Sequence, residues 1–540
     1  MNLTRRDFMK ATGAAGAAMT LGPGMAFGRT GYPKKPNIIV MMVDDMGFSD
    51  LSCLGAEIQT PHLDSLAKNG VMFVNGHSTG RCWPSRACIL TGLYPHQMGY
   101  ENKTPITVEE RKLRRSGGVF IPEILNGVGY STCMAGKWHL DGNPGDRGFK
   151  HTGFCFRGQG GGSSGAGSFW HKSFGPTEYI TDHIGDRVAG NVDQAAKEKQ
   201  PFFIYWTPTA PHWPLHAFTS DIAKYKGKYD TGPKAIAEAR IKRMRELGVF
   251  DAKHPWSVPE YVAEPNKGRL ADVCTELEKD NPKPAKGFNW CHWKSGSYGN
   301  KRKAASYEEM MEIYAAQVDR MDQSVGKVIA KLKETGTYDN TLFLFCSDNG
   351  ASSESMGNGR AWAGASNTPF KRWKKDSYEG GVATPFLVHW PAATPQARRG
   401  TVDQTWCHLV DVMPTVLDAA GATHPGKDKH GRDISTTEGR SILAALKGDA
   451  VPLKQPIFID HSGNRAVITE EWKLVAQSGQ PWSLYNMTTD RFEQKSLATA
   501  ESDRVKKMDE TWKEWGRRVG AFIPGESPEP KSKKKKRKKR

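Results

Sequence analysis

The chain has 540 residues, of which 38% are hydrophobic and 25% charged; this is an ordinary globular composition in a chain too long for one small core. Its 76 Lys and Arg residues against 58 Asp and Glu residues give a formal net charge of +18. Beyond the N-terminus, no segment is apolar and long enough to be a transmembrane candidate.

The N-terminus carries the features of an export signal. Two arginines in "TRRDFMK" (4–10) precede a weakly apolar stretch rich in Ala and Gly, and small residues follow near 26–28. The Arg5–Arg6 pair is typical of twin-arginine signals. We therefore interpret residues 1–28 as a twin-arginine-type signal and expect an exported protein, periplasmic or extracellular.

Apolar runs that alternate with helical patterns follow this signal. The segment "KPNIIVMMVDDMG" (35–47) predicts a strand over 38–43 that is buried on both faces. The later patterns predict helices at 60–70, from "ACILTG" (87–92) onward and at 305–336. They predict a helix, a turn and a strand over 120–140. Further strands are predicted at 71–79, from 200 to a break at Pro208, in "DNTLFLFC" (339–346) and in "TPFLVHWP" (384–391). This alternation predicts an α/β fold with a mainly parallel central sheet flanked by helices.

The chain divides into a main domain and a smaller subdomain. We expect the main domain to span 29–430, with a flexible Gly-rich loop at 157–171. Within it, residues 218–304 lack a sustained strand pattern and predict a long substrate-shaping excursion with one helix near 233–247. After residue 430, short alternating runs and then an amphipathic helix predict a C-terminal subdomain over 431–525 that contains an antiparallel sheet.

A basic tail ends the chain. Residues 527–540 contain nine Lys or Arg and one Glu and no apolar side chain, so we expect 526–540 to be disordered. The tail is either a solubilising end or an electrostatic attachment to a polyanion such as an acidic polysaccharide or anionic lipid. No aromatic residue interleaves the lysines, so specific nucleic-acid binding by base stacking is not indicated.

Nine cysteines leave the disulfide pattern open. Export permits disulfides, but the number is odd and no C-x-x-C pair occurs, so neither a zinc cage nor a thioredoxin-like motif is indicated. We interpret Cys88 as a buried thiol.

Two predicted strands end in oxygen-bearing side chains. Asp44 and Asp45 follow the first strand, and Asp348 and Asn349 follow the strand in "DNTLFLFC". A single Asp after a strand is more often a helix cap than a ligand. Because ligands bind at the carboxyl ends of parallel strands, the two pairs together predict a site for a hard cation, Ca²⁺ or Mg²⁺ rather than zinc.

Several segments resemble the type I, formylglycine-dependent sulfatases of the alkaline phosphatase superfamily. The resemblance runs from about residue 35 to 520, in family order. The motifs that carry it are "VDDMG" (43–47), "CWPSR" (82–86), "GYSTCMAGKWHL" (129–140), "APHWPL" (210–215), "CSDNGA" (346–351), "KKDSYEGG" (374–381) and "WSLYNMTTDRFEQKSLA" (482–498). The resemblance implies an alkaline-phosphatase-like fold and a catalytic sulfatase domain over 29–430.

The resemblance also implies a modified nucleophile. In this family the cysteine of Cys-x-Pro-Ser-Arg is oxidised to Cα-formylglycine, which here would be Cys82. One hydroxyl of the hydrated aldehyde attacks the sulfur of a sulfate ester and releases the alcohol, and the second hydroxyl then helps to expel sulfate. A formylglycine-generating or other sulfatase-maturing enzyme is therefore an implied partner.

The remaining site roles follow from the same resemblance. A divalent cation, Ca²⁺ in preference to Mg²⁺, would be held by Asp44, Asp45, Cys82, Asp348 and Asn349. The other implied catalytic residues are Arg86, which holds the diol; Lys137 and Lys374, which contact sulfate; His139, which handles the diol proton; and His212, which alone or with Lys374 protonates the leaving alcohol. Lys375 is an alternative to Lys374.

These features predict an exported sulfuric ester hydrolase, arylsulfatase-like, that acts on a sulfated small molecule or polysaccharide. The basic body and tail favour a sulfated carbohydrate. Two alternatives stay open: a phosphonate or phosphate ester hydrolase of the same superfamily, and a non-catalytic protein that binds sulfated glycans if Cys82 is unmodified.

Overall fold

A computed structural model gives the fold. It describes residues 32–33, 35–101, 107–156, 179–213, 215–263, 270, 272–275, 300–353, 359–428 and 431–527. The export signal, the Gly-rich loop at 157–171 and all but the first two residues of the basic tail lie outside the described residues.

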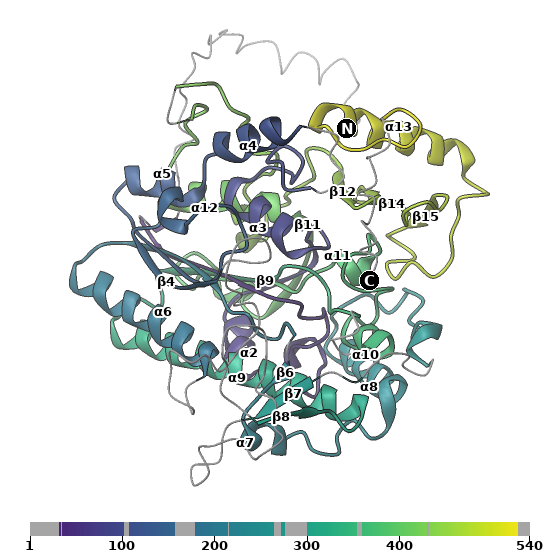
Figure 1. Cartoon of the computed structure of the whole chain (residues 1–540), viewed down its shortest axis with the longest axis horizontal. Helices are drawn as coiled ribbons and strands as arrows, with labels where there is room; N and C mark the ends of the chain where they lie inside the picture. Colours follow the sequence, from purple (N-terminus) through teal and green to yellow (C-terminus); the bar gives the residue numbers. More distant parts are fainter. Residues whose placement is uncertain are drawn as a thin grey trace, which may run out of the picture.

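An eight-stranded mixed sheet forms the centre of the main domain (Figure 1). The first strand, β1, is parallel to both neighbours, β9 and β5, whereas β10 is antiparallel to β9 and β2. In sheet order the strands are β11 (Thr401–His408), β2 (Val71–His77), β10 (Phe386–His389), β9 (Thr341–Ser347), β1 (Asn37–Val43), β5 (Phe202–Thr207), β3 (Ser131–Lys137) and β4 (His151–Phe156). The predicted mainly parallel α/β sheet is confirmed.

Helices cover both faces of this sheet (Figure 1). One layer contains α2 (Pro61–Lys68), α6 (Ile180–Lys197) and α9 (Tyr307–Glu334), and the other contains α3 (Cys82–Thr91), α5 (Ile121–Gly127) and α12 (Val412–Ala420). Successive β1 side chains point to opposite faces, so Ile39 and Met41 join one core cluster and Ile38 and Val40 join the other. This two-sided burial explains why β1 is a continuous apolar run rather than an alternating one.

The start of α3 differs from the prediction. We expected a helix to open at "ACILTG", but α3 begins at Cys82 and that segment completes it. Pro84 lies in the first turn, where its missing N–H costs no hydrogen bond, and Gly92 ends the helix with a φ of 64°. Cys82 is therefore the first residue of α3 and not part of a preceding loop.

The excursion over 218–304 contains more strand than its sequence indicated. The predicted helix is present as α8 (Gly232–Glu246), and α7 (Thr219–Ala223) precedes it. A three-stranded sheet joins β6 (Leu215–His216), β7 (Asp272–Thr275) and β8 (Asn300–Lys303). Strands of two to four residues are too short to produce a recognisable period of two.

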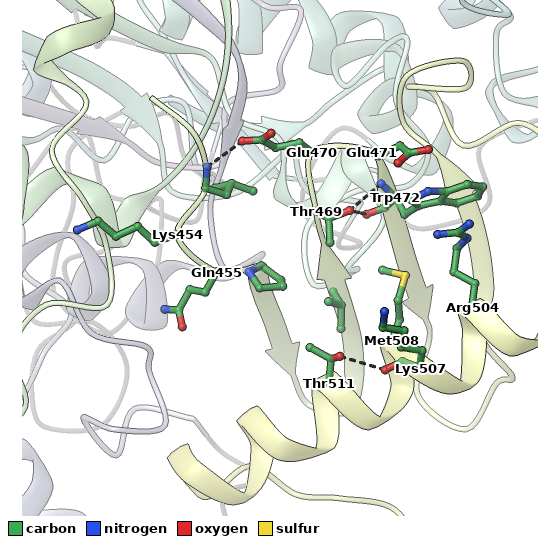
Figure 2. Close-up of a pocket in the computed structure, with 13 residues that line it drawn as sticks. Lys454, Gln455, Thr469, Glu470, Glu471, Trp472, Arg504, Lys507, Met508 and Thr511 are labelled. Carbon is green, nitrogen blue, oxygen red and sulfur yellow. Dashed lines mark hydrogen bonds between the residues drawn. The ribbon is translucent and has the colours of Figure 1, made fainter. Parts of the chain in front are cut away.

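The C-terminal sheet and helix are confirmed. The antiparallel sheet contains β12 (Ile457–His461), β13 (Asn464–Ile468), β14 (Trp472–Ala476) and β15 (Ser483–Asn486), and α13 (Ser502–Val519) packs against β13 and β14. A groove of about 520 Å³ lies between this sheet and α13, with Trp472, Arg504 and Met508 in its lining (Figure 2). The boundaries at 430 and 525 stay predictions.

A buried ionic network joins this subdomain to the main domain. Glu379 of α11 (Glu379–Val382) binds His77 at 3.1 Å and Lys473 of β14 at 2.6 Å, and it also pairs with Arg491. Lys473 further binds Glu493 at 2.9 Å. Adjacent strand residues point to opposite faces, so Lys473 faces the main domain and Trp472 faces the groove.

Removing one member of this network should destabilise the protein strongly. Lys473→Met leaves the buried carboxylates of Glu379 and Glu493 short of a cation, so we expect the free energy of unfolding to fall by about 3–5 kcal/mol. Denaturant titration measures the change. Lys507→Met, at an exposed lysine of α13, is the matched control and should be within about 0.5 kcal/mol of the wild type; equal stabilities for the two variants would contradict the prediction.

Candidate active site

The two predicted oxygen clusters meet at the carboxyl edge of the central sheet. The parallel register pairs Val43 with Ser347, the last residues of β1 and β9, so the residues that follow lie side by side. The backbone N–H of Asp45 donates to Asp348 Oδ1 at 3.2 Å, and Asn349 Nδ2 donates to Asp45 Oδ1 at 2.7 Å. Asp44 and these three residues are all buried.

Cationic side chains from three other segments surround these oxygens. Lys137, at the end of β3, donates to Asp44 Oδ2. Arg86 of α3 donates to Asp348 Oδ2 at 3.0 Å and to the Lys137 carbonyl at 2.7 Å, and lies 3.4 Å from Asp44 Oδ2. Burial disfavours the charged form of Asp44, but Lys137, His212 and Arg86 outweigh it and hold its pKa well below the usual range.

Lys374 and His212 complete the cluster. Lys374 Nζ lies 2.7 Å from Asp45 Oδ1, so of the two neighbouring lysines considered it is Lys374 whose ammonium group reaches the site. His212 Nε2 lies 3.5 Å from Asp45 Oδ2. The predicted site residues thus converge, although their chemical roles stay predictions.

Cys82 is the first residue of α3 and is 2% exposed. Burial raises the pKa of a thiol, but the nearby charges of Lys137 and Lys374 outweigh burial and lower the pKa of Cys82. The hydroxyl of Ser85, one helical turn further on, donates to the Asp348 carbonyl at 2.6 Å and fixes α3 to the end of β9.

His139 is held in an uncommon backbone conformation beside this cluster. Its φ is 55°, and Asp45 has a φ of 63°. Left-handed conformations of residues other than glycine concentrate at functional sites, where the surrounding contacts sustain the strain. Burial, then the charges of Lys137 and Arg86, hold the pKa of His139 well below the usual range, so its imidazole is neutral at neutral pH.

The donor set fits a divalent cation. Asp44 Oδ1 and Asn349 Oδ1 are buried and have no hydrogen-bond partner among the described residues. Ligand atoms of Asp44, Asp45 and His212 all lie within 4.8 Å of one another. Buried oxygens without donors are costly unless a cation satisfies them, and carboxylate and amide oxygens suit Ca²⁺ or Mg²⁺.

The C-terminal subdomain holds the segment that carries Lys374, which the sequence motifs did not indicate. Asn464 Nδ2, at the start of β13, donates to the Lys375 carbonyl at 2.7 Å, and Gln477 Nε2 donates to Asp376 Oδ2 at 2.7 Å. Neither residue lies in a recognised motif, and nothing in its sequence neighbourhood indicates a role in the site. Their role in holding the Lys374 segment is visible only once the two parts of the chain are packed together.

Comparisons with known proteins agree with this geometry. The sulfatase family model matches residues 36–422, and the model of the twin-arginine translocation pathway signal sequence matches residues 2–22. The arylsulfatase of Klebsiella aerogenes is 29% identical and covers 80% of this chain and 96% of its own. The N-acetylglucosamine-6-O-sulfatase of Bacteroides thetaiotaomicron is 27% identical and covers 89% and 87%.

A solved structure shares the fold. The crystal structure of Ps i-CgsB in complex with k-i-k-neocarrahexaose has a TM-score of 0.62 at 24% identity and covers 89% of this chain and 93% of that chain.

The fold and the family match define a sulfuric ester hydrolase with an alkaline-phosphatase-like fold. The chain belongs to the sulfatase family, and its signal sequence indicates export across the membrane. Within the described part of the chain, no helix combines the length and apolar character that a membrane span requires.

Loosening the anchor of the Lys374 segment should lower activity without unfolding the protein. Asn464→Ala removes the hydrogen bond to the Lys375 carbonyl, and small displacements of a positioned charge are costly, so we expect kcat for a sulfate ester to fall roughly 10- to 100-fold. Steady-state kinetics measure this. Asn69→Ala, which removes an asparagine hydrogen bond at the end of α2, should keep wild-type kcat; an equal loss in both variants would contradict the positioning role.

Proposed function

We propose that this protein is an exported sulfatase that hydrolyses sulfate monoesters of a carbohydrate in the periplasm or outside the cell, with Cys82 oxidised to formylglycine. The observation that carries the proposal is the position of Cys82 at the first turn of α3, buried and near enough to Lys137 and Lys374 for their charges to lower the pKa of its thiol. A thiol held only for packing needs no such convergence of charged groups around it.

The hydrated formylglycine side chain would supply a hydroxyl nucleophile for the sulfur of the ester. Arg86 is fixed by three acceptors and orients the start of α3. Lys137 and Lys374 bind two sulfate oxygens as fixed positive charges and stabilise the charge that develops there. His139, whose imidazole is neutral, accepts a proton from the hydrated side chain.

The leaving alcohol needs a proton as its bond to sulfur breaks. His212 Nδ1 contacts the carbonyl of Trp213, which orients the ring so that Nε2 lies toward the cluster. His212 Nε2, with the ammonium group of Lys374 beside the same carboxylate, is the donor to the leaving oxygen.

Ca²⁺, in preference to Mg²⁺, would be held by Asp44, Asp45, Asp348, Asn349 and the modified Cys82 and would offset negative charge on the bound sulfate. The two buried oxygens without hydrogen-bond donors support this assignment. The oxygen-rich ligand set and the 3.5 Å approach of His212 to Asp45 leave His212 at the edge of the cation site.

A sulfated carbohydrate agrees with the charge of the chain. The 76 basic residues outnumber the 58 acidic ones, and the tail contributes nine of the basic residues, so a polyanionic substrate would be attracted to the protein. The name of one relative, N-acetylglucosamine-6-O-sulfatase, supports a sugar substrate. A sulfatase-maturing enzyme is the partner that the proposal requires.

The state of Cys82 tests the nucleophile. We expect mass spectrometry of the alkylated peptide that spans Cys82–Arg86, from protein made in its own host, to find an aldehyde instead of an alkylated thiol. Cys82→Ala should lower kcat/KM for sulfate esters by about a thousandfold or more because the nucleophile is lost. Cys88→Ala, at a buried thiol of the same helix, is the control.

The outcomes separate the alternatives. Full alkylation of Cys82 with retained glycan binding would favour the non-catalytic binding protein. Faster release of phosphate or phosphonate than of sulfate from matched aryl esters would favour the other hydrolase class.

The cation site has a test that does not depend on activity. Asp45→Asn keeps the shape of the side chain but removes one negative charge, so we expect Ca²⁺ affinity measured by calorimetry to fall about tenfold or more. Asp193→Asn, at a surface aspartate paired with Lys197, is the charge-matched control and should bind Ca²⁺ like the wild type. Equal affinity in all three proteins would contradict the assignment.

A further inference from the structure

Asp45, a proposed ligand of the cation, has a backbone conformation that residues other than glycine seldom adopt. Its φ of 63° turns the chain sharply after the end of β1. A left-handed residue of this kind persists only where the surrounding contacts over-determine it. The hydrogen bond from its own N–H to Asp348 Oδ1 fixes one side of the turn. The other side, which is the Asp45 carbonyl and the residues that follow, needs further contacts.

Tyr314 and Ser347 supply two of these contacts. The buried hydroxyl of Tyr314, on α9, lies 3.3 Å from the carbonyl oxygen of Asp45 and donates to Asp50 Oδ2 at 2.7 Å. The backbone N–H of Met46 donates to Ser347 Oγ, at the end of β9, at 3.2 Å. Residues of α9 and β9 therefore fix the chain directly after Asp45.

Asp50 accepts the hydrogen bonds that organise the rest of this turn. Its Oδ2 accepts from the backbone N–H of Gly47 at 2.8 Å as well as from Tyr314, and its Oδ1 accepts from Arg240 Nη1 at 2.7 Å. The carboxylate thus closes residues 47–50 into a tight loop and keeps the Tyr314 hydroxyl beside the Asp45 carbonyl. Asp50 is buried, and a carboxylate is buried at an acceptable cost only where such donors satisfy it.

Arg240 extends this network to the excursion over 218–304. It lies on α8, is buried, and binds Glu57 through Nε at 2.9 Å and through Nη2 at 2.8 Å in addition to Asp50. A planar guanidinium that bridges two carboxylates fixes both in position. The position of α8 is therefore linked, through Asp50, to the turn that contains Asp45.

The chemistry of this network favours a positioning role over simple packing. Apolar side chains of similar volume can fill a core as well as a buried ion pair does, without the cost of removing charges from water. A network of charged and hydroxyl groups instead specifies one arrangement of the chain around it. The turn also has little room to shift, because a Cβ at Gly47 would lie 2.3 Å from the carbonyl oxygen of Ser366, the last residue of α10 (Gly359–Ser366).

We propose that Asp50 and Tyr314 are positioning residues that hold Asp45 in the backbone conformation required for cation binding, and that Arg240 makes this conformation depend on the packing of α8. The inference rests on the proposed function, because it takes Asp45 as a ligand of the cation. Asp45 Oδ1 also accepts from Asn349 Nδ2 and lies 2.7 Å from Lys374 Nζ. A relaxed turn would therefore displace the carboxylate from the cation, the amide and the ammonium group together.

Removal of one hydroxyl tests the network without opening a large cavity. Tyr314→Phe keeps the ring and loses the hydrogen bonds, so we expect the Kd for Ca²⁺, measured by calorimetry, to rise about threefold to tenfold. Tyr130→Phe is the matched control, because that buried hydroxyl donates to the Pro36 carbonyl at 2.9 Å, and Pro36 precedes β1 at the opposite end of the strand from Asp45. The control should keep the wild-type Kd whatever stability it loses.

Two further variants test the rest of the network. Asp50→Asn replaces one acceptor oxygen with an amino group that faces donors, so we expect the Kd for Ca²⁺ to rise about tenfold or more. Arg240→Lys keeps the charge but cannot bridge Asp50 and Glu57, and should raise the Kd by a smaller factor. In each variant saturating Ca²⁺ should restore most of kcat for a sulfate ester. A merely structural role would lower the yield of folded protein and leave both the Kd and the Ca²⁺ dependence of kcat unchanged.

The Kd values separate the outcomes. A Kd for Ca²⁺ that is unchanged in Tyr314→Phe and Asp50→Asn, or raised equally in Tyr130→Phe, would overturn the inference and leave the cation site to be judged by Asp45→Asn. An unchanged Kd in Arg240→Lys would overturn the link to α8. A wild-type protein that neither binds Ca²⁺ nor hydrolyses any sulfate ester would overturn the proposed function, and the inference with it.

Discussion

The buried guanidinium of Arg86 is the interaction on which the site depends. It joins the start of α3 to the ends of three strands: to Asp44 after β1, to Asp348 after β9 and to the carbonyl of Lys137 in β3. Burial of a guanidinium is costly unless acceptors surround it, so the packing that brings these oxygens to Arg86 is favoured over arrangements that separate them. That arrangement also brings Cys82, four residues earlier on the same helix, to the edge of the sheet.

The site divides between the two parts of the chain. The main domain supplies the groups proposed to surround the nucleophile and the cation; most lie on α3 or directly after the ends of strands, and Lys374 lies in the segment before α11. The C-terminal subdomain supplies the supports: Asn464 and Gln477 hold the segment of Lys374, and Lys473 binds Glu379 at its end. A loose subdomain would therefore disturb the chemistry without contacting the bound sulfate.

The sequence predicted those parts of the site that follow a recognisable strand pattern or belong to a contiguous motif. The apolar runs before Asp44 and Asp348 predicted buried parallel strands. The carboxyl ends of parallel strands lie at the same edge of a sheet, whatever the conformation of the connecting loops. Cys82 and Arg86 were recognisable because their motif is contiguous. The first residue of α3 was not, because the apolar residues that mark a helix face lie in its second half. Asn464 and Gln477 could not be found, because their contacts join residues more than 80 positions apart in sequence.

The burial of Cys82 sets an order of events for its proposed oxidation. Because Cys82 is 2% exposed and α3 shares a core cluster with the sheet and α12, an oxidising enzyme could not reach the thiol in the finished fold. The proposed oxidation would therefore have to take place before α3 packs into the fold. Twin-arginine export delivers chains that have already folded, so the oxidation of Cys82 would take place in the cytoplasm. A copy that folds without this modification would be exported and could no longer be oxidised.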